Sequence, residues 1–136
     1  MAISGGCYCG AVRFEIDGQV RMRALCLCRT CQKISGGAGN LFIGLQADDF
    51  RYTHGEPRYF TRADVAEAPT REFCGECGVH LASRSPKAPG GMIVKVGTLD
   101  DPAVFAGPAM VFWAEQKQGF HRLPDDATVF PRLPGR

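Results

Sequence analysis

The sequence predicts a mainly β domain of short antiparallel strands with little helix. Its 136 residues suit one domain. The 17 glycines and 9 prolines are spread along the chain and leave little room for long helices. Short apolar or alternating runs recur between turn signals, as they do in antiparallel sheets. Seven cysteines in close groups suggest that metal ties part of the domain together.

Two hairpins are expected in the first half of the chain. Residues 11–16 alternate apolar and polar side chains, which is typical of a half-buried strand. A turn at 17–18 separates them from a second strand at 20–25, and this hairpin would carry Cys9 and Cys26 to the same end. Residues 50–53 and 58–60 predict another hairpin around a Gly/Pro turn.

The remaining elements are shorter or less regular. A helical turn is expected at 29–35, where glycines follow. An apolar strand is expected at 41–45, and the β-branched content of 92–96 predicts a central strand. A weaker strand is expected at 109–113. We expect one domain over 1–131 and a polar, Pro-rich, poorly ordered tail at 132–136.

Charge and hydropathy limit which partners and which cellular compartment are expected. The net charge of +2 does not favour nucleic acid, and no apolar run has the length of a membrane span. No secretory signal is visible at the start of the sequence. We therefore expect a cytoplasmic protein whose reducing surroundings disfavour disulfides.

The cysteine spacing predicts metal, with zinc preferred and iron–sulfur as the rival. The cysteines occur in three groups: Cys7-x-Cys9, Cys26-x-Cys28-x-x-Cys31 and Cys74-x-x-Cys77. Two divisions fit this spacing. The two C-x-x-C pairs could form one four-sulfur site, or the first and last groups could form it and leave the middle group as a three-sulfur site.

The second division is chemically more economical. Three thiols between Cys26 and Cys31 can bind a metal ion without help from elsewhere and leave one coordination position vacant. Structural zinc sites have four protein ligands, whereas catalytic ones keep a position for water or substrate. A division of four plus three therefore predicts one structural and one reactive site.

The three cysteine motifs resemble those of the glutathione-dependent formaldehyde-activating enzyme family, which includes the centromere protein V domain. The resemblance is carried by Gly6–Val12, Cys26–Lys33 and Phe73–Gly78, together with Gly36, Gly55, 123–126 and 130–131. It implies a β-tent fold and two zinc ions per chain. The vacant coordination position of the second site favours partial occupancy there. The implied ligands are Cys7, Cys9, Cys74 and Cys77 for the structural zinc, and Cys26, Cys28 and Cys31 for the open zinc.

The resemblance also implies a reaction. Family members condense formaldehyde with glutathione to S-hydroxymethylglutathione, which is carbon–sulfur lyase chemistry. The expected partner is therefore glutathione or a related small thiol. The alternative is a non-catalytic glutathione-binding or protein-interaction module. This chain has Leu27 where many members have histidine.

Charged residues near the middle cysteine group are candidates for supporting roles. Arg29 and Lys33 could offset the negative charge of the thiolates or hold glutathione carboxylates, and the alternative is that both are solvated surface charges. We interpret His54, His80 and His121 as structural or surface residues. The aromatic side chains of Phe112, Trp113 and Phe120 are interpreted as core packing.

Overall fold

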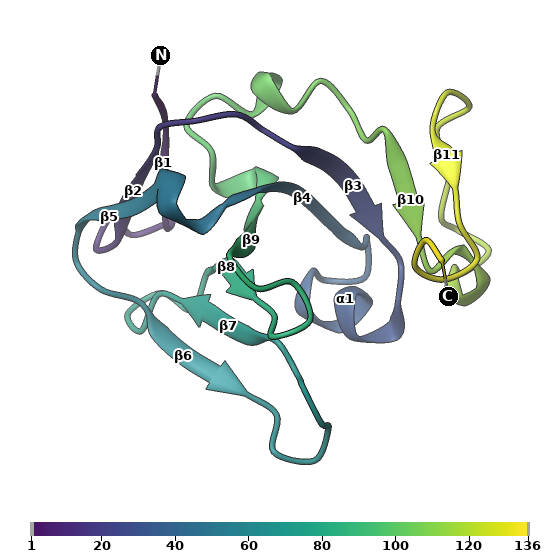
Figure 1. Ribbon diagram of the computed structural model, residues 1–136, viewed down its shortest axis with the longest axis horizontal. Coiled ribbons are helices and arrows are strands. Elements are labelled where there is room, and N and C mark those ends of the chain that lie inside the picture. The colour runs from purple at the N-terminus through teal and green to yellow at the C-terminus, as the bar shows by residue number, and fades with distance from the viewer. Residues whose placement is uncertain (1, 136) are drawn as a thin grey trace.

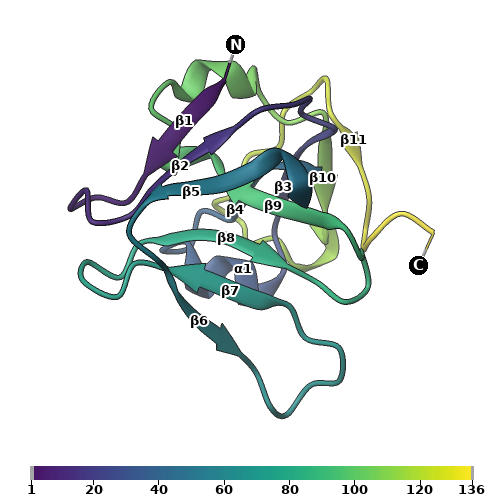
Figure 2. The ribbon, with the colours of Figure 1, turned by 60° about the vertical axis from the view of Figure 1, so that its left-hand side comes forward.

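Figure 1 shows the computed structural model, which describes residues 2–135. Its strands form two sheets. The small sheet contains β1 (Ile3–Gly6), β2 (Arg13–Ile16) and β5 (Phe50–His54), in the order β1-β2-β5. Both of its pairings are antiparallel. Figure 2 shows its strands beside one another and next to the larger sheet.

The larger sheet has eight strands in the order β11-β10-β3-β4-β9-β8-β7-β6. Its strands are β3 (Met22–Cys26), β4 (Asn40–Gln46), β6 (Arg58–Thr61), β7 (Thr70–Phe73), β8 (His80–Arg84), β9 (Gly91–Lys95), β10 (Met110–Phe112) and β11 (Thr128–Val129). The one α-helix of residues 2–135 is α1 (Arg29–Ile34). Short 3-10 helices cover Ala47–Asp49, Val96–Thr98, Pro102–Phe105 and Ala114–Gln116.

The predicted fold class is confirmed: the domain is mainly β, and its helices are short. The helical turn at 29–35 and the central strand at 92–96 are both present, the latter as β9 between β4 and β8. Strand β10 departs from the antiparallel pattern because it pairs in parallel with both β3 and β11. None of the helices in residues 2–135 has the length and apolar character needed to cross a membrane.

Both predicted hairpins are wrong. Strand β2 pairs with β1 and β5, while β3 pairs with β4 and β10. Likewise, β5 and β6 do not pair with each other. Strand β5 completes the small sheet, and β6 forms the far edge of the large one. The reason is burial: Phe14 and Ile16 of β2 are almost completely buried in the core shared by the two sheets. Residues 17–21 and 55–57 therefore cross between sheets and do not close tight turns.

The two faces of the large sheet have different surroundings. Residues paired across neighbouring strands share a face. Ile43 and its partner Val94 therefore lie together, in the core that also contains the small sheet. Phe42 and Cys26 lie on the opposite face, in a second apolar cluster with Phe112. This second face, on which α1 also contributes Cys31, is where the candidate site lies.

The last described residues lie against this second cluster. Arg132 donates from Nε to Glu115 Oε1 at 2.8 Å, and its carbonyl accepts from the Trp113 N–H at 3.1 Å. Leu133 packs against the second cluster.

Candidate metal centres

The structure brings four cysteines together at two hairpin turns. Cys7 and Cys9 lie in the turn that joins β1 to β2, and Cys74 and Cys77 lie in the turn that joins β7 to β8. Their sulfurs all lie within 4.8 Å of one another. This four-cysteine cluster links the small sheet to the large one, because each sheet supplies one of the turns.

The spacing of these sulfurs fits a tetrahedral metal site. The Sγ atoms of Cys7 and Cys9 are 3.7 Å apart, and those of Cys9 and Cys74 are 3.8 Å apart. Four sulfurs bound to one zinc ion at about 2.3 Å are separated by about 3.8 Å. None of the seven cysteines is in a disulfide. The donor set and its geometry therefore fit zinc.

Backbone N–H groups support the sulfurs of the four-cysteine cluster. Val12 N donates to Cys7 Sγ at 3.3 Å, and Glu76 N donates to Cys74 Sγ at 3.4 Å. Such bonds stabilise thiolates and orient them. Gly10 and Gly78, each directly after the second cysteine of its turn, have φ of 83° and 79°, a region that favours glycine. The turns are thus built locally to present their sulfurs.

A second group, the three-cysteine cluster, consists of Cys26, Cys28 and Cys31. Cys26 ends β3, Cys28 caps the N-terminus of α1, and Cys31 lies in the first turn of that helix. The Cys31 N–H donates to Cys28 Sγ at 3.3 Å. A strand running directly into a short helix therefore gathers the three sulfurs within 4.8 Å.

Three adjacent thiols cannot all ionise without a nearby cation. Hydrogen bonds from the thiols of Cys26 and then Cys31 lower the pKa of Cys28 to about 2. The same contacts, first with Cys28 and then with Cys31, raise the pKa of Cys26, and burial raises it further. A divalent cation removes this conflict because it deprotonates each coordinating thiol. The chemistry of the three-cysteine cluster therefore also fits a metal ion.

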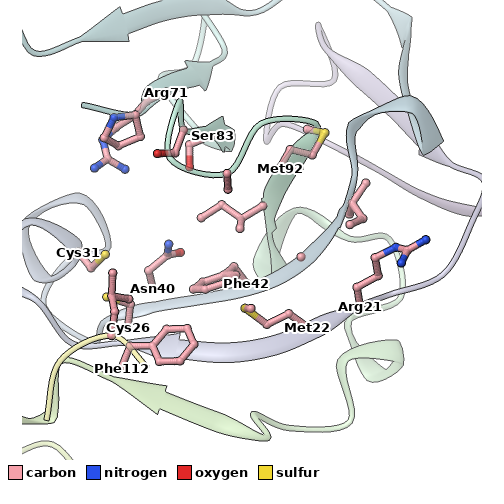
Figure 3. Close-up of a pocket in the computed structure, with 18 residues that line it drawn as sticks. Arg21, Met22, Cys26, Cys31, Asn40, Phe42, Arg71, Ser83, Met92 and Phe112 are labelled. Carbon is pink, nitrogen blue, oxygen red and sulfur yellow. The ribbon is translucent and has the colours of Figure 1, made fainter. Parts of the chain in front are cut away.

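A cavity of about 480 Å³ adjoins the three-cysteine cluster. Figure 3 shows Cys26 and Cys31 at one end of it and Arg21 at the other. Its wall is mostly apolar and includes Met22, Phe42, Met92, Ile93, Phe112 and Leu133. The large sheet curls, so that Arg71 of β7 and Phe112 of β10 line the same space. Of the aromatic residues interpreted from the sequence as core packing, Phe112 serves both the core and the cavity wall. The same interpretation is wrong for Phe120, which is 70% exposed.

Sequence reasoning missed two polar residues beside the sulfurs. Asn40 on β4 is paired with Cys26, only 2% exposed, and its Oδ1 has no hydrogen-bond partner. Lys95 on β9 is half-buried, and burial lowers its pKa to about 8 although the nearby Cys31 and Cys26 act in the opposite direction. A signal for Lys95 was present, because a lysine in the central run 92–96 is unusual for a buried strand.

Arg29 and Lys33 lie outside the cavity beside the three-cysteine cluster. Both are exposed, and both line a separate hollow of about 600 Å³ with Phe120 and the glycines that follow α1. The Arg29 guanidinium donates to Gln32 Oε1 on the next turn of the helix. Neither residue is among those that line the cavity beside the three-cysteine cluster. Their proposed contacts with thiolates or with glutathione stay predictions.

The three histidines have separate surroundings. His54 is exposed. His121 is buried, accepts from the Gln118 N–H at 2.9 Å through Nδ1, and lies 2.6 Å from the Gly37 carbonyl through Nε2, so it ties two loops together. His80 lies 3.0 Å from the Ala82 carbonyl. Burial, followed by the charge of Lys95, lowers the His80 pKa to about 4.

The fold and the two clusters define a small, mainly β protein with one four-sulfur and one three-sulfur candidate metal site. A family model for glutathione-dependent formaldehyde-activating enzyme matches residues 2–116. The chain belongs to this family.

Two relatives illustrate the similarity. A protein of Halomonas elongata, named as a putative glutathione-dependent formaldehyde-activating enzyme, is 34% identical over 95 residues, which cover 65% of this chain and 60% of that protein. The chain thus spans less than two thirds of that relative's length. A crystal structure of a Rhodobacter sphaeroides protein shares the fold with a TM-score of 0.59 and 21% identity, covering 71% of this chain and 87% of the other.

Proposed function

We propose that this chain adds the thiol of glutathione to formaldehyde at the three-cysteine cluster and so forms S-hydroxymethylglutathione. The observation that carries the proposal is the difference between the two clusters. Four sulfurs make up one, whereas three make up the other, and two of those three line a cavity. Family membership supports the choice of substrates.

The metal would differ in its role at the two sites. The four-cysteine cluster would hold a structural zinc ion that fixes the two sheets together. Zinc at the three-cysteine cluster would supply a fourth coordination position, at which an incoming thiol loses its proton. Two zinc ions per chain are therefore expected.

The residues around the three-cysteine cluster suit the addition. One C–S bond forms, the carbonyl π electrons move to oxygen, and that oxygen takes up a proton, so no oxidant or reductant is needed. Lys95 lies close enough to Cys31 and Cys26 to offset their negative charge. The side-chain oxygen of Asn40, on the residue paired with Cys26, has no partner and would accept a hydrogen bond from the O–H of the new hydroxyl group. The reverse reaction breaks the C–S bond, which is carbon–sulfur lyase chemistry.

The surface around α1 would supply contacts for the tripeptide. Glutathione carries two carboxylates, and arginine binds a carboxylate through two parallel hydrogen bonds. We expect Arg29 and Lys33, in the hollow that α1 forms with the glycines after it, to hold these groups while the sulfur reaches the cluster.

Exchange NMR of glutathione and formaldehyde tests the proposal. Zinc-loaded protein should accelerate interconversion with S-hydroxymethylglutathione beyond the spontaneous rate. Cys28→Ser should abolish the acceleration. Tyr8→Ser should keep it, because Tyr8 is 91% exposed on the other metal-site loop.

The outcome of this experiment shows whether the chain is an enzyme or a non-catalytic binding module. An unchanged exchange rate at full zinc loading would exclude this reaction. If titration calorimetry still showed glutathione binding that Cys28→Ser weakens, the chain would be a non-catalytic glutathione-binding protein.

A further inference from the structure

We infer that the aldehyde used at the three-cysteine cluster carries an apolar aliphatic or aromatic group, so that aldehydes larger than formaldehyde are the better substrates. This inference rests on the proposed function for the type of reaction and goes beyond it in the class of substrate. It is carried by the size and wall of the cavity and by one unpaired polar atom at its metal-site end.

The cavity is too large and too apolar for formaldehyde alone. Its volume of about 480 Å³ lies in the range of sites for organic ligands. Met22, Phe42 and Ile93 line it from three neighbouring strands. The polar peptide body of glutathione would lose hydrogen bonds to water against such a wall, which is costly. A hydrocarbon group has no such cost and gains from burial.

The register of the large sheet explains why the space exists. Gly44 on β4 faces the cavity, between Met22 on β3 and Ile93 on β9. It contributes no side chain, so the floor between its two partners stays open. A Cβ atom there would lie 3.0 Å from the Met22 Cβ, which is a tight contact. Gly44, at the centre of this three-strand row, therefore leaves part of the cavity open.

The cavity is chemically asymmetric. Cys26, Cys31 and Asn40 lie close together at one end, as Figure 3 shows. Asn40 Oδ1 is buried and has no partner, which costs free energy unless a ligand supplies a hydrogen bond. An adduct of the form R–CH(OH)–S matches this arrangement: sulfur at the cysteines, hydroxyl at Asn40, and the group R along the apolar wall.

Two stable thioethers of glutathione test the inference without turnover. S-hexylglutathione and S-methylglutathione share the tripeptide and differ only in the apolar group. Each methylene buried in an apolar site tightens binding about fourfold. Titration calorimetry with zinc-loaded protein should therefore show S-hexylglutathione binding more than about tenfold tighter. Equal affinities would overturn the inference.

Variants that fill the cavity show where the hexyl group binds. Ile93→Trp fills the cavity and should remove the preference for the hexyl group. Val129→Trp adds the same side chain at an exposed position on β11 and should leave the preference intact. If Ile93→Trp does not fold by circular dichroism, Ser83→Leu offers a second filling variant, because Ser83 also lines the cavity. A preference that survives filling would place the hexyl group elsewhere and overturn the inference.

Turnover distinguishes this inference from the proposed function. Exchange NMR should show a larger acceleration with hexanal than with formaldehyde, and Ile93→Trp should reduce only the hexanal rate. If the protein accelerates the reaction of formaldehyde but shows no preference for S-hexylglutathione, the proposed function holds and the inference about larger aldehydes is wrong. The third outcome is a preference for the hexyl group that Ile93→Trp removes, with no acceleration for either aldehyde. It would show that the cavity binds the apolar group, and it would reject the proposed reaction.

Discussion

Asn40 lies directly opposite Cys26 in the ladder between β4 and β3, and its Oδ1 is buried with no hydrogen-bond partner. Directly opposed residues project from the same face of a sheet. Backbone pairing therefore places the Asn40 side chain on the same face of the sheet as the Cys26 sulfur. A buried polar atom without a partner destabilises the fold, and such costs are common at functional sites.

Replacing Asn40 should separate stability from function. We expect Asn40→Leu to raise the free energy of unfolding by about 1 kcal/mol, because the unpaired oxygen is removed from a buried site. The same change should lower the rate of adduct formation about tenfold or more. Urea denaturation and exchange NMR measure the two effects.

The control is a residue with the same defect away from the cavity. Arg23 Nε is also buried without a partner, but Arg23 does not line the cavity. Arg23→Met should leave the rate unchanged. A rate for Asn40→Leu equal to the wild-type rate would show that Asn40 takes no part in the reaction.

The four-cysteine cluster should be essential for the fold. Cys9→Ser removes one ligand from a site whose metal binding is expected to contribute about 10 kcal/mol to folding. Because domains are stable by only about 5–15 kcal/mol, the variant should lose one zinc ion and most of its stability. Elemental analysis and thermal melting test this, with Tyr8→Ser as the neighbouring control. A zinc-depleted variant that melts like the wild type would contradict a structural role.

Lys95 should contribute more than Lys33 to the affinity of the three-cysteine cluster for zinc. Its ammonium group is half-buried and close to Cys31 and Cys26, whereas Lys33 is exposed. We expect Lys95→Gln to weaken zinc binding at this cluster about tenfold, since charges interact more strongly away from water. Lys33→Gln should have no effect on it. Competition with a chelator measures both affinities, and the reverse ranking would restore Lys33 as the compensating charge.

His80 should make the fold sensitive to acid. Burial and the charge of Lys95 hold its pKa at about 4, below the ordinary 6.5. The unfolded chain therefore takes up a proton before the folded chain does, so stability is complete above pH 6.5 and falls as the pH drops toward 4. The loss should reach about 1–2 kcal/mol, allowing for solvent at the exposed edge of the ring.

The His80 effect appears as a difference between variants. His80→Gln should show a shallower fall in unfolding free energy between pH 7 and pH 5 than the wild type. His54→Gln, at an exposed position, should follow the wild type. Parallel curves for all three proteins would show that another group causes the acid sensitivity.

Several strand positions could be predicted from the sequence, but β1, β7, β8 and β11 were missed, and strand partners could not be predicted. The alternating run at 11–16 and the β-branched run at 92–96 both form strands close to the expected bounds. The hairpins failed because neighbouring strands were assumed to pair. In the structure, β2 and β3 lie in different sheets, and Phe14 and Ile16 of β2 are buried in the core between the two sheets.

The sequence by itself determined which residues could bind metal in this protein. Close spacing keeps Cys26, Cys28 and Cys31 together in any compact fold, because a six-residue segment cannot separate them far. Only the tertiary structure placed Cys9 within 3.8 Å of Cys74, 65 residues away, where spacing also allowed Cys28 and Cys31 as partners. It also placed Asn40 and Lys95 beside the three-cysteine cluster and opened the apolar cavity there. These features come from register and sheet curvature, which depend on contacts between distant segments and leave no local pattern in the chain.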